Sequence, residues 1–132
     1  MCPHSAGRKL ILVVDEVEET REATEKLLTA DGYSVSASRD QRDAIERAKR
    51  QHPELILMSR GAQTTDAVAT IRRIRDCATG ERTVPLVIFC VETIAEGAET
   101  NIGENTHLCN PDNFDQLRRL IRRLLNQFSP VS

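Results

Sequence analysis

The chain has 132 residues, of which 39% are hydrophobic and 29% are charged, and this balance indicates one globular domain rather than a disordered chain. A formal net charge of −2 provides no general attraction to nucleic acid or to an anionic membrane surface. No apolar run approaches the length of a membrane span, and the first residues lack the apolar stretch of a secretory signal, so we expect a cytoplasmic protein.

We expect the single folded domain to cover residues 9–128, between flexible tails at residues 1–8 and 129–132. The four cysteines are Cys2, Cys77, Cys90 and Cys109. Their spacing does not match that of zinc ligands, so we interpret them as free thiols.

The first half of the chain predicts two strand–helix pairs. Residues 9–14 predict a strand: after Lys9 they form a continuous apolar run, which is typical of a strand buried on both faces of a parallel sheet. Residues 18–31 predict a helix that Gly32 ends. Residues 33–37 alternate polar and apolar side chains, which favours an edge strand, and residues 40–51 predict a second helix. The expected core positions of the first helix are Ala23, Leu27, Leu28 and Ala30.

The second half of the chain continues the alternation. Residues 55–58 and 86–91 are apolar runs that predict buried strands, and a helical pattern over residues 65–77 lies between them. A weaker run at residues 106–109 predicts the fifth strand. Residues 114–128 carry the clearest helical spacing of apolar side chains in the chain.

Five strands alternating with helices predict a doubly wound α/β fold with a parallel sheet. In such sheets, binding and catalytic residues gather at the carboxyl ends of the strands. The residues at these ends are Asp15, Glu16, Ser59, Cys90 and Asn110.

The first of these ends carries two adjacent carboxylates, Asp15 and Glu16. Such a pair suits a cation such as magnesium, but a solvated acidic turn has the same sequence pattern. The turn lacks the glycine-rich loop that dinucleotide and flavin phosphates need, which excludes that class of protein.

Several segments resemble, in order and spacing, the receiver domain of bacterial response regulators. They are ILVVDE, then Arg21 and Leu28, then DGYSV, PELILM, IRRIR and VPLVIF. The resemblance covers about residues 9–128 and implies the CheY-like receiver fold, a flavodoxin-like parallel sheet with the strand order 2-1-3-4-5.

The resemblance also implies five key positions, and this chain departs from the family at most of them. Asp15 matches the first magnesium-binding acid, and Glu16 stands where the second is usually aspartate. Ser59 replaces the aspartate that accepts the phosphoryl group, Cys90 replaces a threonine or serine, and Asn110 replaces a lysine. Because serine has no carboxylate, Ser59 cannot form an acyl phosphate.

Other family features have also changed. His107 occupies the position of the aromatic switch residue, although it also fits a half-exposed strand residue. The loop after the third strand keeps only Asp66 in register. Gly97 and Gly103 interrupt the expected fourth helix, so we expect that helix to be short or irregular.

The last helix carries four arginines, Arg118, Arg119, Arg122 and Arg123. A solvated helix face explains them, and so does recognition of an acidic partner, since the resemblance places this helix on a docking face. Nucleic-acid binding is the least favoured explanation, because the chain has few aromatic residues and a negative charge.

These observations predict a pseudo-receiver, which is not an enzyme and acts by contacting a histidine kinase, another receiver or an output protein, with a homodimer as a further option. We expect no cofactor, and at most weak magnesium binding at Asp15 and Glu16. One alternative is an active regulator phosphorylated on Asp66 or Ser59. Another is a haloacid-dehalogenase-like phosphatase, whose second acid would fall on Val17.

Overall fold

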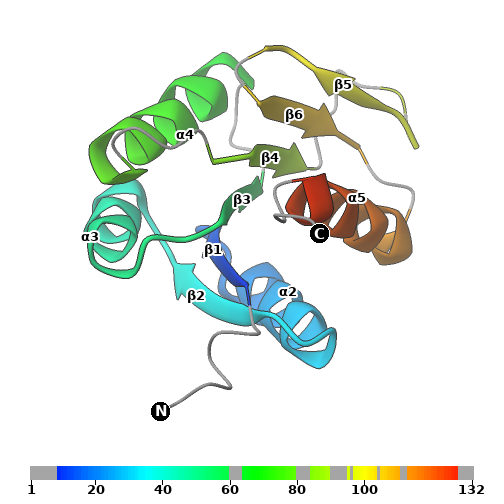
Figure 1. Ribbon diagram of the computed structural model, residues 1–132, viewed down its shortest axis with the longest axis horizontal. Helices are drawn as coiled ribbons and strands as arrows, with labels where there is room; N and C mark the ends of the chain where they lie inside the picture. Colours follow the sequence, from blue (N-terminus) through cyan, green and yellow to red (C-terminus); the bar gives the residue numbers. More distant parts are fainter. Residues whose placement is uncertain are drawn as a thin grey trace.

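The computed structural model describes residues 9–59, 64–79, 84–89, 95, 97–103, 105–110 and 113–127, without the side chains of 64–67, 77–79, 126 and 127. Helices and strands alternate along this part of the chain (Figure 1). In order they are β1 (Leu10–Val14), α2 (Glu18–Ala30), β2 (Ser34–Ser38), α3 (Gln41–Gln51), β3 (Leu55–Ser59), α4 (Thr64–Thr79), β4 (Leu86–Phe89), β5 (Glu99–Asn101), β6 (Thr106–Cys109) and α5 (Phe114–Gln127).

The strands form one sheet in the order β2-β1-β3-β4-β6-β5. All neighbouring pairs are parallel except β5 and β6, which are antiparallel. The predicted doubly wound parallel sheet is therefore confirmed, with β6 as the fifth parallel strand. The expected number of strands was wrong, because β5 adds a sixth strand at the edge of the sheet.

Strand β5 lies between β4 and β6, in the segment where we expected a short or irregular helix. Three residues flanking β5 have positive φ angles: Gly97 (85°), Gly103 (99°) and Asn105 (59°). This backbone geometry is incompatible with a continuing right-handed helix but suits tight turns. Thr106 donates its N–H to the Gly103 carbonyl at 3.1 Å and so closes the turn of the β5–β6 hairpin.

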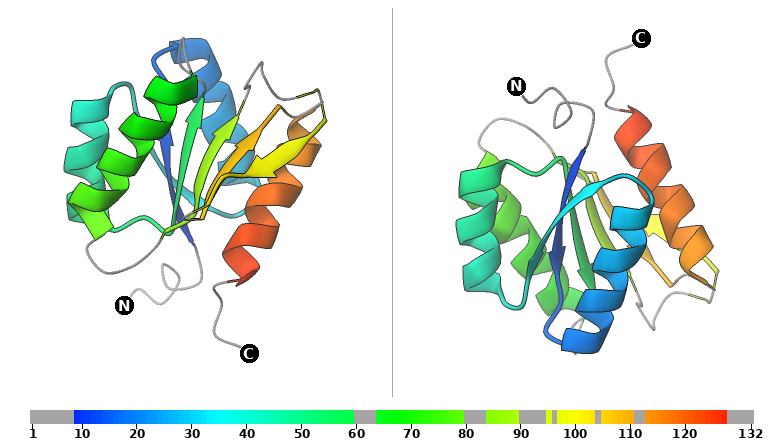
Figure 2. Two further views of the ribbon diagram at one scale, coloured as in Figure 1. Left: turned by 90° about the horizontal axis from the view of Figure 1, so that it is seen from above. Right: turned by 90° about the horizontal axis from the view of Figure 1, so that it is seen from below.

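Helices α2 and α5 cover one face of the sheet, and α3 and α4 cover the other (Figures 1 and 2). The buried side chains divide accordingly into two cores. Ile11 and Val13 of β1 pack toward α2 and α5, whereas Leu12 and Val14 pack toward α3 and α4. This alternation explains why the central strands are apolar along their whole length, as a sheet covered on both faces requires.

The expected core of the first helix needs a correction. Leu28 is fully buried, but Ala23 and Ala30 are exposed. Thr24 takes the second buried position, because residues four apart lie on the same side of a helix. In the described part of the chain, no helix is long and apolar enough to cross a membrane.

Candidate functional site

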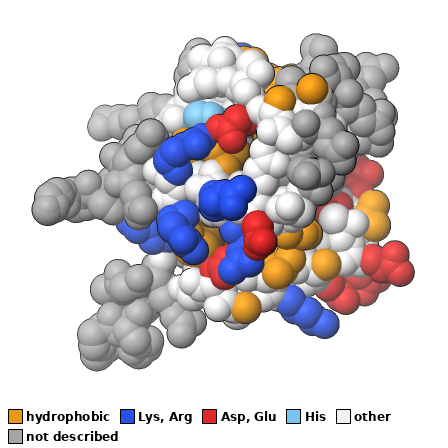
Figure 3. Space-filling view, turned by 90° about the vertical axis from the view of Figure 1, so that its right-hand side faces the viewer, with side chains coloured by type: hydrophobic (Ala, Val, Ile, Leu, Met, Phe, Trp, Pro, Cys, Tyr) orange, Lys and Arg blue, Asp and Glu red, His pale blue; other side chains and the backbone are white. Residues whose placement is uncertain are grey.

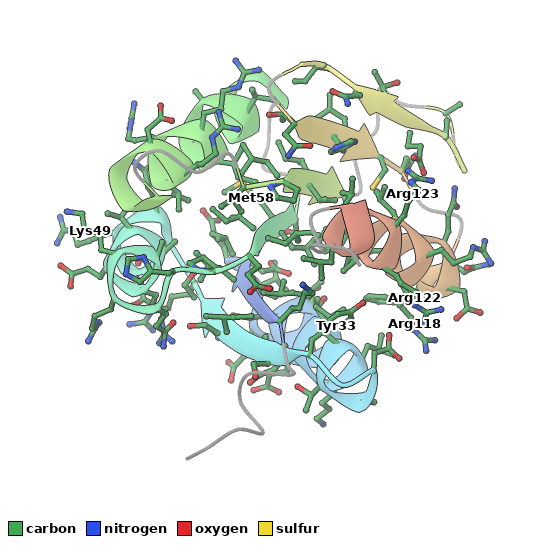
Figure 4. All side chains as sticks on the ribbon, viewed as in Figure 1. Tyr33, Lys49, Met58, Arg118, Arg122 and Arg123 are labelled. Carbon is green, nitrogen blue, oxygen red and sulfur yellow. The ribbon has the colours of Figure 1, made fainter. Side chains whose placement is uncertain are left out.

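A pocket of about 210 Å³ opens at the carboxyl ends of β1 and β3. Val14 of β1 pairs with Met58 of β3, which is labelled in Figure 4, so the next residues, Asp15 and Ser59, lie at the same level of the sheet. The residues lining the pocket are Val14, Asp15, Glu16, Val17, Arg39, Asp40, Gln41, Met58, Ser59 and Thr70. The structure therefore brings together Asp15, Glu16 and Ser59 from separate segments of the sequence.

Asp15 is the most constrained polar group of the pocket. Its side chain is 3% exposed, and its Oδ1 accepts a hydrogen bond from the Val17 N–H at 2.9 Å. The Arg21 guanidinium holds the Asp15 carbonyl at 3.0 Å. The other carboxylate oxygen, Oδ2, is buried and has no hydrogen-bond partner among the described residues. A buried carboxylate oxygen without a partner is costly, so Oδ2 is suited to a cation or a hydrogen-bond donor.

Ser59 is partly buried and supplies a neutral hydroxyl to the pocket. The described residues contain no group of three or more histidine, cysteine, aspartate or glutamate side chains placed to hold a metal ion. Magnesium prefers several anionic oxygen ligands. Asp15 and Glu16 supply carboxylates after β1, and Asp40 lines the pocket from the end of β2, where its Oδ1 caps α3, but the end of β3 supplies none. These residues fit a three-carboxylate magnesium site poorly.

Val17 lines the same pocket as the residue that precedes α2, and its side chain is 55% exposed. A haloacid-dehalogenase phosphatase would need its second acid here. Valine has no titratable group, so this position cannot supply a general acid.

The sequence analysis missed four polar residues that line the pocket: Arg39, Asp40, Gln41 and Thr70. The first three follow the carboxyl end of β2. The tendency of polar residues to gather at the carboxyl ends of strands could have identified them. Thr70 lies on α4 within a helical pattern, and nothing in its sequence context distinguishes it.

Asn110 follows β6 and does not line this pocket. Its backbone belongs to the hairpin: the Gly97 N–H donates to the Asn110 carbonyl at 2.7 Å, and the Asn110 N–H donates to the Ala98 carbonyl at 3.1 Å. Cys90 and the side chain of Asp66 lie outside the described residues. Cys109, in β6, is buried and is not part of a disulfide.

His107 lies in the middle of β6 and pairs with Asn101 of β5. Its exposure is 9%, so the alternative of a half-exposed strand residue is wrong. The ring Nε2 lies 3.4 Å from the Asn105 Oδ1. Burial lowers the pKa of His107, and the negative charge of Glu99 opposes this effect. The neutral ring is therefore the favoured form.

The arginines of α5 do not act as one uniform stripe. Figure 4 shows Arg123 on the side of α5 toward β5, and Arg118 and Arg122 on the side toward α2. Arg118 donates hydrogen bonds to both carboxylate oxygens of Asp31, each at 2.6 Å, and Arg123 forms an ion pair with Glu99. Arg119 and Arg122 are both exposed. Several lysine and arginine side chains, drawn in blue, lie on the side of the molecule that Figure 3 shows.

The Arg118–Asp31 pair joins the start of α5 to the residue after α2. Asp31 is only 11% exposed, and the hydrogen bonds from Arg118 hold its pKa below the usual value of an aspartate. A second carboxylate, Asp115, contacts Arg118 at 2.8 Å but is 67% exposed. Asp31 is therefore the main partner of Arg118, and this pair links α5 to the end of α2.

Comparison with known proteins gives a consistent result. The model of the family "Response regulator receiver domain" matches residues 11–122. The chain is 28% identical over 121 residues to "Response regulator MprA" of Mycobacterium leprae, and 29% identical over 127 residues to "Transcriptional regulatory protein CseB" of Streptomyces coelicolor. These matches cover 91% and 93% of the chain, which spans about half the length of these relatives, 52% in each case.

Solved structures show the same fold. A two-component response regulator from Clostridium difficile superposes with a TM-score of 0.70 at 15% identity, covering 92% of this chain and 99% of that one. The receiver domain of the hybrid histidine kinase CckA gives a TM-score of 0.64 at 20% identity, covering 88% and 98%.

Proposed function

We infer that this chain, which belongs to the response regulator receiver family, is a receiver that signals through protein–protein contacts without being phosphorylated. Receiver domains work in two-component systems, between histidine kinases and output proteins. This chain has the fold of such a domain, and it keeps the acidic end of β1.

The observation that carries the proposal is the position of Ser59. It ends β3 and lines the pocket beside Asp15, where an active receiver needs a third carboxylate. A hydroxyl is a poor nucleophile without an adjacent base, and a phosphoserine would not be the acyl phosphate that drives the family's switch. The position that should accept the phosphoryl group therefore lacks the group that reacts.

The strand ends beyond β3 support the same proposal. Asn110 stands where a lysine would neutralise phosphoryl charge, and an amide can donate a hydrogen bond but carries no charge. Its backbone is already held by the β5–β6 hairpin. In the sequence, Cys90 offers only a weakly donating thiol in place of a hydroxyl.

In this proposal the chain is not an enzyme and works in the cytoplasm. Its partner is a protein of the same signalling class: a histidine kinase, another receiver or an output protein. The exposed Arg119 and Arg122 of α5 suit an acidic surface on such a partner.

Amide chemical shifts test the proposal, with beryllofluoride and magnesium as the phosphoryl mimic. We expect no change in the native protein or in Ser59→Ala. In Ser59→Asp we expect changes only around the pocket, because Asn110 and Cys90 offer little extra attraction to the mimic. Large shifts at His107 and along Phe114–Gln127 in Ser59→Asp would show that the switch still works, and would contradict the proposal.

A further inference from the structure

A second, larger pocket of about 550 Å³ lies at the free edge of the sheet, around the carboxyl end of β2. Its lining comes from α2, β2, the β2–α3 connection and α3. The lining residues are Arg21, Ala37, Arg39, Asp40, Arg42, Asp43, Glu46 and Arg47. Four of these eight residues are arginines. We call it the arginine pocket.

Two of the four guanidinium groups are held in place by the protein. Arg21 donates from Nη1 to the Asp15 carbonyl at 3.0 Å. Arg47 donates from Nε to the Asp43 carboxylate at 3.0 Å and from Nη1 to the Ser36 hydroxyl at 3.1 Å. Each of these groups keeps further N–H donors, since a guanidinium has five. Their positions are therefore fixed before any ligand arrives.

The other two guanidinium groups are available. Arg39 and Arg42 are exposed, and the described part of the chain places no hydrogen-bond or ion-pair partner on either of them. They flank the start of α3, on either side of the residues that begin the helix. Two guanidinium groups without a described partner therefore lie beside two that the protein holds in place.

The acidic residues of the pocket offset these charges only in part. Asp40 uses Oδ1 to cap α3 by accepting the Asp43 N–H at 2.8 Å. Asp43 is paired with Arg47, so its charge is already offset. Glu46 is exposed and is the third acid, which leaves four cations against three anions.

We propose that the arginine pocket binds a small phosphate-bearing molecule. Guanidinium groups match phosphate oxygens with paired hydrogen bonds, and the volume lies within the usual range of small-molecule sites. Arg39 and Asp40 line both this pocket and the pocket of Asp15 and Ser59, so a ligand bound here would contact residues that the two pockets share. The inference does not depend on whether Ser59 is phosphorylated.

Calorimetric titration with pyrophosphate, read together with amide chemical shifts, tests the proposal. The test variant is Arg39→Gln with Arg42→Gln. The control is Lys49→Gln with Arg50→Gln, which removes the same charge from exposed positions of α3 outside the pocket. Lys49 lies on the outer side of α3 in Figure 4. All four side chains are exposed, so neither variant should disturb folding.

We expect saturable binding, with shifts confined to the lining residues and an affinity that falls as salt rises. The test variant should bind about tenfold more weakly or worse, because charge-assisted hydrogen bonds are lost, whereas the control should change little. Glu46→Gln should tighten binding, because it removes one of the three negative charges of the pocket. Absence of saturable binding, or equal loss in the test and control variants, would overturn the proposal.

Discussion

At the scale of single residues, the metal affinity of the pocket of Asp15 and Ser59 depends on the carboxylates at the ends of β1 and β3. Asp15 is buried and leaves Oδ2 without a partner among the described residues, which is an arrangement that a cation would complete. Ser59 contributes no charge beside it. The pocket therefore combines a buried carboxylate at the end of β1 with a neutral hydroxyl at the end of β3.

Magnesium affinity follows from this arrangement. We expect the native protein to bind magnesium more weakly than micromolar, since hard divalent cations depend on anionic oxygen ligands. Ser59→Asp should tighten binding by about tenfold or more, because it restores a third carboxylate. Ser59→Asn is the control, because asparagine is similar in size to aspartate but carries no charge. Titration calorimetry that gives micromolar affinity for the native protein would contradict this prediction.

The Asp31–Arg118 pair predicts how stability depends on pH. Because the pKa of Asp31 is lowered in the folded protein, its contribution is present above the aspartate's ordinary pKa and is lost as pH falls through the lowered value. Asp31→Asn should therefore reduce the free energy of unfolding at pH 7, and the deficit should shrink below about pH 4. Urea unfolding at both pH values measures this.

Asp115→Asn is the matched control for the same arginine, because Asp115 also contacts Arg118 but is far more exposed. We expect a smaller loss of stability from it, since exposed ion pairs contribute little. Equal losses from the two variants, or a deficit of Asp31→Asn that does not depend on pH, would show that the buried anchor has been assigned incorrectly.

At the scale of elements, the β5–β6 hairpin is the feature that separates this chain from the expected five-stranded sheet. Helix α5 holds it at two places: Gln116 donates to the Gly97 carbonyl, and Arg123 pairs with Glu99. Strand β5 has three residues, all exposed, so its own contacts provide little stability. The hairpin therefore depends on α5.

Arg123→Gln should loosen the hairpin while leaving the central sheet intact. We expect faster hydrogen exchange, by about tenfold at most, at the Gly97 and Ile102 amides, which bond within the hairpin. Exchange in β1 and β3 should not change. Arg122→Gln removes the same charge from an exposed position of the same helix and serves as the control. Slow exchange that persists at Gly97 and Ile102 would show that the pair with Glu99 does not hold β5.

The elements that the sequence predicted well are those with a strong local pattern. No tertiary information was needed to predict β1, β3, β4 and α5. A strand buried on both faces is apolar along its length, and a helix buried on one side has regularly spaced apolar residues. Strand β5 could not be predicted in the same way. Its sequence, Glu99–Asn101, has no apolar residue, and only its pairing with β6 makes it a strand.

The candidate site was predictable in part. Asp15, Glu16 and Ser59 follow apolar strands, and the parallel sheet brings them together as expected. Arg39 and Asp40 follow β2, a polar edge strand, so the apolar run that marks the ends of the other strands is missing before them. The partners of Arg118 and Arg123, Asp31 and Glu99, lie 87 and 24 residues away in sequence, and no local pattern reports such pairs.

At the scale of the whole molecule, one sheet separates two cores and carries two polar pockets near the carboxyl ends of its first three strands. The scaffold is that of a receiver, and a serine ends β3 beside Asp15. In the proposed function, the chain keeps the receiver fold for contacts with signalling partners and lacks the acceptor of the phosphoryl group.

Intact mass after incubation with acetyl phosphate and magnesium tests this claim most directly, with an active receiver treated alongside as the positive control. We predict that the native protein keeps its unmodified mass, whereas the active receiver gains one phosphoryl group. Asp66→Ala and Ser59→Ala, treated in the same way, identify the acceptor if the native protein is modified. A mass increase of one phosphoryl group that either substitution abolishes would contradict the account.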